Sequence, residues 1–255
     1  MTDLRYPTLP NDWLLLLIAP FIGSFLGVVI SRLPQGRPVG FARSACDSCG
    51  AQLCARDLLP LVSYAWLRGR CRHCGSSIGW FHPIVELVAV GIAAWVIVAS
   101  RDGVSIWIDA AFGWSLVTLS WIDARCRRLP DVLTLPLILA GLAVTGWHQP
   151  AAIADHAMAA ALAYAGFRLI NWCYRMVRHR DGLGAGDAKL LAGAGAWLGV
   201  ALLPATVLIA AISCLLVAGL LALSGRTMRR DTALPFGPFI ALALWLLWLH
   251  YANGA

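Results

Sequence analysis

The apolar residues of this chain come in blocks of roughly 18–20, which is the length an α-helix needs to cross the hydrocarbon core of a bilayer. The chain holds eight such blocks: 13–31, 83–100, 105–122, 132–148, 151–173, 187–201, 203–223 and 234–251. Hydrophobic residues make up 60% of the chain and charged residues 13%, whereas soluble domains average about 45–50% and about 25%. The pattern predicts an all-α, polytopic membrane protein with about eight transmembrane helices.

Lysine and arginine gather in four of the segments that separate these blocks. The four segments are 32–82, 123–131, 174–189 and 224–233. They alternate along the chain, so the positive-inside rule places all of them in the cytoplasm. Both termini are then expected in the periplasm of a bacterial inner membrane. The net charge of +7 is accounted for by this topology and by acidic lipid headgroups, so nucleic-acid binding is not expected.

Segment 32–82 is the one long polar stretch between the apolar blocks. A module of about 50 residues buries little core and usually needs a staple, such as a metal. We therefore expect three parts: a first transmembrane helix in 1–31, a cytoplasmic module in 32–82, and a seven-helix membrane domain in 83–255.

Two C-x-x-C pairs in this module, separated by 21 residues, could bind such a stabilising metal ion. They are formed by Cys46, Cys49, Cys71 and Cys74. Pairs at about this spacing are typical of a four-cysteine zinc site, which is structural because it leaves no open coordination position. Gly50 and Gly75 follow the pairs, where tight turns are common. Two disulfides or a redox pair are the alternative, but a cytoplasmic location disfavours both.

Acidic residues are scarce, and a carboxylate at the edge of the bilayer is a functional candidate. Asp123 ends the block 105–122, and Asp187 begins the block 187–201 directly after Gly184 and Gly186. The first block runs towards the cytoplasm and the second away from it, so both aspartates should lie at the same depth near the cytoplasmic face. Asp131 begins the fourth block, and Glu86 lies within the second.

Two carboxyl groups that approach closely share a proton. The ionised one can activate a water, while the protonated one polarises a carbonyl group, which is aspartic-protease chemistry. The glycines before Asp187 would let an extended substrate backbone come close. The alternative is that Asp187 caps a helix N-terminus, where aspartate is favoured. These arguments also leave open whether Asp123 or Asp131 is its partner.

The ordered motifs of the chain resemble those of the bacterial prepilin peptidases, also called type IV leader peptidases, of the GxGD class of intramembrane aspartic proteases. The resemblance covers nearly the whole chain. It rests on the segments Gly23–Pro34, His82–Glu86, Ile122–Asp131, Gly182–Leu190 and Leu234–Pro238, together with both C-x-x-C pairs. Gly27 stands where many members carry asparagine.

The resemblance implies that Asp123 and Asp187 are the catalytic pair. It also implies cleavage of type IV prepilins or type II secretion pseudopilins after a glycine, at the cytoplasmic membrane face, which removes a short basic leader. Many members then methylate the new N-terminal amine with S-adenosylmethionine, an activity that accompanies the cysteine module. Glu86 is a candidate for binding an amine or the cofactor, or for pairing with an arginine.

Two other functions fit parts of the sequence. A proton-coupled transporter would also use intramembrane carboxylates, but near the bilayer midplane rather than at one face. A membrane thiol oxidoreductase would use the C-x-x-C pairs, but it requires accessible redox-active thiols instead of a filled zinc site.

Overall fold

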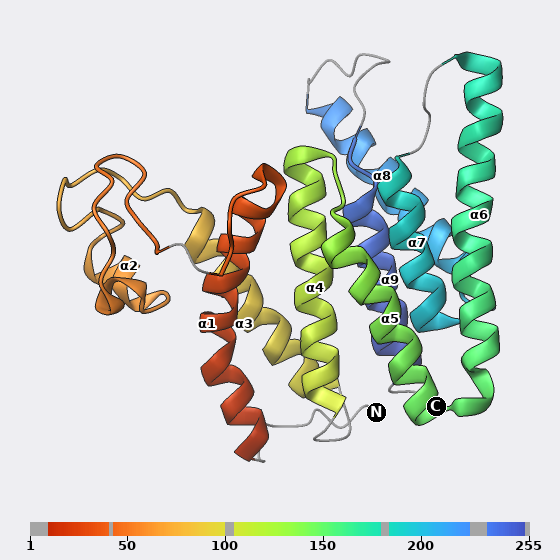
Figure 1. Ribbon diagram of the computed structural model, residues 1–255, viewed down its shortest axis with the longest axis horizontal. Helices are drawn as coiled ribbons and strands as arrows, with labels where there is room; N and C mark the ends of the chain where they lie inside the picture. Colours follow the sequence, from red (N-terminus) through yellow and green to blue (C-terminus); the bar gives the residue numbers. More distant parts are fainter. Residues whose placement is uncertain (1–9, 41–42, 100–104, 180–183, 225–233, 253–255) are drawn as a thin grey trace. The chain divides into compact units, whose positions relative to one another are not determined.

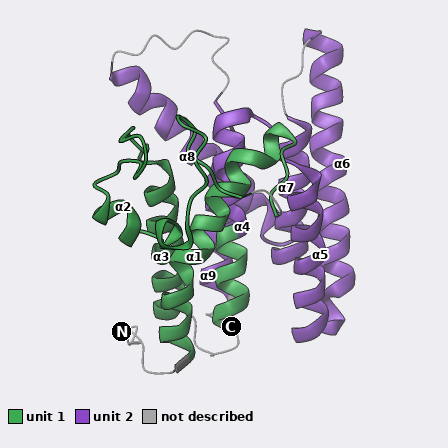
Figure 2. Ribbon diagram, turned by 60° about the vertical axis from the view of Figure 1, so that its left-hand side comes forward, with its two compact units in different colours: residues 1–114 green, residues 115–255 purple. Residues whose placement is uncertain are grey.

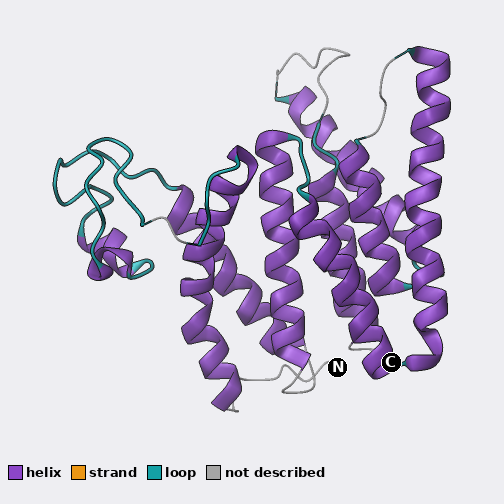
Figure 3. Ribbon diagram, in the orientation of Figure 1, coloured by secondary structure: helices purple, strands orange, loops and turns teal. Residues whose placement is uncertain are grey.

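The computed structural model describes the chain apart from residues 1–9, 41–42, 100–104, 180–183, 225–233 and 253–255. Gly182 and Leu183 of the second aspartate motif lie outside the described residues, as do most of the basic segment 224–233 and part of 174–189. The described part of the chain is helical, with isolated bridges in the cysteine module and no extended strand (Figure 3). The predicted all-α class is therefore confirmed.

Among the described residues, each of the eight apolar blocks forms one helix, and a five-residue helix lies in the cysteine module (Figure 1). The helices are α1 Pro10–Arg32, α2 Val62–Trp66, α3 Phe81–Ala99, α4 Ser105–Cys126, α5 Asp131–His148, α6 Ile153–Arg178, α7 Ala185–Leu198, α8 Leu203–Leu223 and α9 Gly237–Ala252. The break between α7 and α8 falls at Gly199, whose φ of +74° favours glycine.

Four of these helices are long and apolar enough to cross a membrane, so the chain is a multi-pass membrane protein. They correspond to the segments Asn11–Gln35, Phe81–Ala99, Asp131–His148 and Leu203–Leu223. Helix α7 has 14 residues, or about 21 Å at 1.5 Å per residue, which is less than the roughly 30 Å hydrocarbon core. The full count of eight spans stays a prediction.

The chain forms two compact units, residues 1–114 and 115–255, with the boundary inside α4 (Figure 2). In the first unit, α1 packs along α3. The crossing is close at Gly23, where a Cβ atom would lie 2.6 Å from the Cα of Glu86. The indole of Trp114 donates a hydrogen bond of 3.0 Å to the carbonyl of Ala89. The division into 1–31, 32–82 and 83–255 stays a prediction.

Helix α7 is the core of the second unit, because α5, α6, α8 and α9 all contact it. Its residues from Asp187 to Leu198 are buried on nearly every side, as expected for a helix that is apolar all round. Small residues allow this enclosure: a Cβ atom on Gly195 would lie 2.5 Å from the backbone of Ala159 in α6. Such close backbone approach is typical of helix pairs in membranes.

Polar groups fix the end of α7 opposite Asp187. The backbone N–H of Val200 donates to the carboxylate of Asp155 at 3.2 Å. The Nδ1 atom of His156 lies 3.1 Å from the Thr145 hydroxyl and 3.0 Å from the carbonyl oxygen of Ala196. These contacts join α5 and α6 to the C-terminal end of α7, and they hold its register.

Candidate functional site

The two C-x-x-C pairs adopt the same turn. The N–H groups of Gly50 and Gly75 donate to the carbonyls of Cys46 and Cys71 at 2.9 and 3.0 Å. Both glycines have a φ of +69°, in the left-handed region that glycine adopts without strain. A short antiparallel bridge flanks each turn, from Ala45 to Gln52 and from Arg70 to Ser77. The spacing of the cysteines therefore predicted two matching knuckles correctly.

The knuckles bring the four cysteines into one cluster. The ligand atoms of Cys46, Cys49, Cys71 and Cys74 all lie within 4.8 Å of one another. The Sγ atoms of Cys46 and Cys74 are 3.9 Å apart, close to the roughly 3.8 Å that separates two thiolates around tetrahedral zinc with bonds of about 2.3 Å. The predicted cluster is confirmed, and its geometry fits a metal ion of this kind.

The knuckle also favours the thiolate form of Cys46. The backbone N–H groups of Cys49 and Ser48 and the hydroxyl of Ser76 lower the pKa of the Cys46 thiol from 9.0 to about 6. Donors aimed at sulfur favour the charged form, and zinc binds that form. The hydrogen bonds of the turn and the binding of a cation therefore favour the same state of Cys46.

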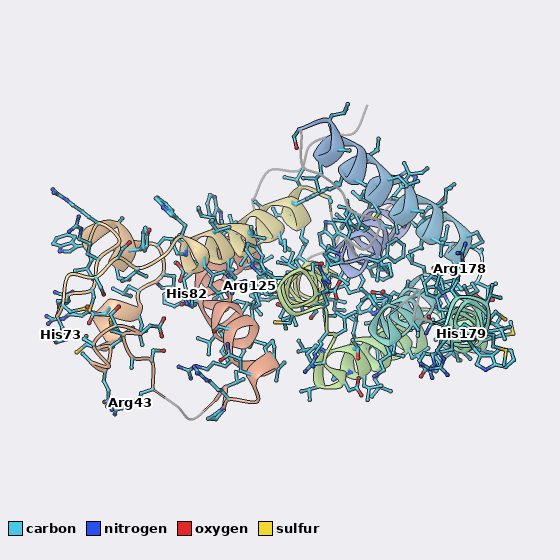
Figure 4. All side chains as sticks on the ribbon, turned by 90° about the horizontal axis from the view of Figure 1, so that it is seen from above. Arg43, His73, His82, Arg125, Arg178 and His179 are labelled. Atoms are coloured by element: carbon cyan, nitrogen blue, oxygen red, sulfur yellow. The ribbon has the colours of Figure 1, made fainter. Side chains whose placement is uncertain are left out.

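A surface ion pair supports the module outside the knuckles. The guanidinium of Arg72 lies 2.7 Å from the carboxylate of Asp57, and this pair lowers the pKa of Asp57. Arg72 lies between the two cysteines of the second knuckle, so the pair joins that knuckle to the segment Ala55–Leu58. Arg43 and His73 lie on the exposed loops of the same module (Figure 4).

Asp123 lies near the end of α4 and is 5% exposed. Its Oδ2 atom accepts a hydrogen bond of 3.0 Å from the backbone N–H of Gly237, at the start of α9. A Cβ atom on Gly237 would lie only 2.7 Å from that oxygen. The glycine thus lets the first turn of α9 reach the carboxylate. The sequence marked Gly237 as part of a motif, but it gave no indication of this contact.

Asp187 lies in the first turn of α7 and is 9% exposed. Its Oδ2 atom accepts the N–H of Gly184 at 3.3 Å, so the carboxylate also caps its helix, as the alternative interpretation expected. It interacts electrostatically with Asp123 as well. The two aspartates therefore lie near each other, although they are 64 positions apart in the printed sequence.

Side chains from the segment after α4 contact the second aspartate motif. Leu129 is buried and packs on Gly186, where a Cβ atom would lie 2.9 Å from the leucine Cβ. Lys189, one turn into α7, pairs with the carboxylate of Asp131. We expected Gly186 to make room for a substrate backbone, but in the structure it makes room for a leucine of the same chain.

Asp131 differs from the other two aspartates in its surroundings. Its side chain is 57% exposed and is neutralised by Lys189, and it is the first residue of α5 with Pro130 at the cap position. Asp123 and Asp187 are both buried. Asp123 and Asp131 therefore differ in burial and in charge pairing, and which of them acts with Asp187 stays a prediction.

Glu86 is 6% exposed on α3, and it contacts the module. Its Oε2 atom accepts the backbone N–H of Leu61 at 2.8 Å, and it also forms a hydrogen bond with the side chain of Ser24. Neither partner is an arginine. Nearby, a Cβ atom on Gly27 would lie 2.7 Å from Nδ1 of His82, so the histidine ring occupies the space that a side chain at position 27 would need.

Family models cover both halves of the chain. One described as "Type IV leader peptidase family" matches residues 110–219, and one described as "Bacterial Peptidase A24 N-terminal domain" matches residues 17–100. The aspartates lie within the first range and the four cysteines within the second. No solved structure matches the chain significantly.

Curated relatives match over most of their length. A protein of Burkholderia pseudomallei (strain K96243) is 39% identical over 248 residues, which cover 86% of this chain and 79% of the relative. One of Dickeya chrysanthemi is 36% identical over 262 residues, which cover 92% of each. A Pseudomonas aeruginosa relative is 34% identical over 261 residues. All three carry the name "Prepilin leader peptidase/N-methyltransferase".

Two family models match the chain in order, and several relatives are more than 30% identical to it over most of its length. This chain therefore belongs to the type IV leader peptidase family.

Proposed function

We propose that this protein cleaves the leader from type IV prepilins or type II secretion pseudopilins and then methylates the new N-terminal amine. The names of its relatives and its family membership support both activities. The structural observation that carries the protease assignment is the pair of buried, interacting carboxylates, Asp123 and Asp187. A third motif contributes Gly237, whose N–H donates to Asp123.

The aspartate pair supplies the chemistry of peptide hydrolysis. The ionised carboxyl takes a proton from a water, whose oxygen then attacks the scissile carbonyl, while the protonated carboxyl donates to the carbonyl oxygen. Collapse of the tetrahedral intermediate releases an amine and a carboxylic acid. The N–H of Gly237 holds Oδ2 of Asp123 at 3.0 Å, and that of Gly184 orients Asp187, so both carboxyl groups are positioned before a substrate arrives.

Orientation follows from charge. We infer that the module and both aspartates face the cytoplasm and that both termini lie in the periplasm, because arginine and lysine gather in alternate segments. Arg125, Arg127 and Arg128 follow Asp123 in the sequence, and Lys189 follows Asp187, which agrees with one cytoplasmic face for the site.

The cysteine module would hold zinc as a structural ion. Four thiolates would leave no open coordination position, so the contribution of the ion would be to stabilise the fold of the module. S-adenosylmethionine, when bound, would supply an electrophilic methyl group with its sulfur as the leaving group, and the amine that takes the methyl group would lose a proton.

The assignment is tested with purified protein in lipid vesicles and a type IV prepilin, with the products measured by mass spectrometry. Asp123→Asn and Asp187→Asn keep the shape of the side chains but remove the carboxylates, so each is expected to lower cleavage at least a thousandfold. Asp131→Asn is the matched control, and it is expected to retain cleavage within threefold because its side chain is exposed.

Retained cleavage in either buried variant would exclude that residue from the catalytic pair, and loss in Asp131→Asn would reverse the choice between the two candidates. A mass increase of 14 Da on the mature N-terminus, dependent on added S-adenosylmethionine, would establish methylation. If the wild-type enzyme produces mature pilin without this mass increase, only the peptidase activity would be supported.

A further inference from the structure

Leu61 stands at a strained turn in the cysteine module. Its φ of 59° and ψ of −45° lie outside the regions that leucine normally adopts, and the N–H of Val62 donates to the carbonyl of Pro60 across it. This is a γ-turn with a positive central φ, the rare and strained form of that turn. Such a conformation persists only when its surroundings hold it, and it tends to occur at functional positions.

The group that holds this turn comes from a membrane helix. Glu86 of α3 accepts the N–H of Leu61 at 2.8 Å, across 25 positions of sequence. Glu86 is 6% exposed, and leaving a buried N–H group without an acceptor costs more free energy than leaving an exposed one unpaired. Helix α2 begins at Val62, directly after the turn, so the contact also sets where that helix starts.

The position of Glu86 is itself fixed by α1. Its carboxylate also bonds the side chain of Ser24, and its Cα faces Gly23 at the closest approach of α1 and α3. The γ-turn of the module, α1 and α3 therefore meet at one buried carboxylate. His82 lies one turn before Glu86 at the start of α3 (Figure 4), and its ring contacts α1 at Gly27.

We propose that Glu86 is a positioning residue that fixes the cysteine module to the α1–α3 pair, and that methylation, but not cleavage, depends on this contact. The dependence on methylation rests on the proposed function. Cleavage is spared because Asp123, Asp187 and Gly237 all belong to the second compact unit. Glu86 acts as a hydrogen-bond acceptor here, so its charge is not required.

Two substitutions of similar volume separate this role from direct binding of an amine or cofactor. Glu86→Gln keeps an acceptor oxygen for Leu61 but removes the charge, and it is expected to retain methylation within threefold. Glu86→Leu removes the acceptor, so the methylated fraction of mature pilin should fall at least tenfold while the cleavage rate stays within threefold. Hydrogen exchange of the peptide that contains Leu61 should accelerate at least tenfold in Glu86→Leu alone.

A double variant provides an independent test. Glycine adopts a positive φ without strain, so Leu61→Gly in the Glu86→Leu background should restore methylation at least threefold. Equal loss in Glu86→Gln and Glu86→Leu would overturn the proposal, since it would assign the effect to charge. Unchanged exchange at Leu61 in Glu86→Leu would overturn it as well.

The wild-type protein distinguishes failure of the proposed function from failure of this inference. If it neither cleaves nor methylates a prepilin, the proposed function is wrong. The exchange of Leu61 and the zinc content of the Glu86 variants still decide whether the contact anchors the module.

Discussion

Substitution of Gly237 by alanine tests whether the first turn of α9 positions the Asp123 carboxylate that we propose to be catalytic. The new Cβ atom would lie 2.7 Å from Oδ2 of Asp123, about 0.7 Å closer than the 3.4 Å at which ordinary van der Waals contact begins. Either the carboxylate or the start of α9 must move by about that distance. The hydrogen bond of 3.0 Å between the Gly237 N–H and Oδ2 would be stretched or lost.

The size of the effect follows from two estimates. A hydrogen bond to a charged group contributes about 1.5–3 kcal/mol, and about 1.4 kcal/mol corresponds to a tenfold change in rate. A displacement of about 1 Å in a catalytic site can lower the rate by about a hundredfold. We therefore expect kcat/KM for prepilin cleavage to fall between about tenfold and a hundredfold in Gly237→Ala.

The stability of the protein should not fall in parallel. Gly237 is the first residue of α9, so the change leaves the interior of the helix untouched. Gly219→Ala in α8 is the matched control, because a Cβ atom there meets nothing within 4 Å. Both variants would be assayed for cleavage in lipid vesicles and for thermal unfolding by tryptophan fluorescence. Cleavage by Gly237→Ala within threefold of the wild-type rate would refute the proposed positioning of Asp123.

Three further predictions concern the metal, the helix packing and the surface ion pair. The pKa of Cys46 is lowered from 9.0 to about 6 in the folded module, so the stability that its thiolate contributes is present above pH 9 and is lost as the pH falls through 6. Bound zinc also holds the thiolates deprotonated, so zinc release, followed with a chromogenic chelator, should have a midpoint below pH 6 and take up more than one proton per ion. Release of zinc at pH 7 without chelator would contradict this prediction. Gly195→Ala should lower the unfolding temperature by several degrees, because its Cβ would meet the backbone of α6 at 2.5 Å, whereas Gly166→Ala in the open part of α6 should not; equal unfolding temperatures for the two would contradict the close packing. Lys189→Met removes the partner of the exposed Asp131, and it should change the free energy of unfolding by less than about 1 kcal/mol, as for other surface ion pairs. A larger change in a thermal unfolding assay would contradict this and show that the pair holds the two aspartate motifs together.

The residues that sequence reasoning identified most reliably are those whose roles depend on near neighbours. Helix formation follows from contiguous apolar blocks, and all eight blocks became helices within a few residues of their expected ends. The knuckles at Cys46 and Cys71 follow from two-residue spacing and a glycine, because a turn of that size is fixed by its own backbone. The choice of Asp123 over Asp131 came from motif resemblance, since both aspartates stand beside an apolar block.

Tertiary structure decided the contacts between distant parts of the chain. The N–H of Gly237 reaches Asp123, Leu129 fills the space beside Gly186, and Glu86 holds the turn at Leu61. None of these pairs has a periodic signal in sequence, because each arises from how helices cross and not from the order of residues along one helix. The sequence by itself determined the helices, the cysteine knuckles and the candidate aspartates. Packing decided which carboxylate is buried beside Asp187 and which is neutralised at the surface, because burial and partner distance exist only once the helices have come together.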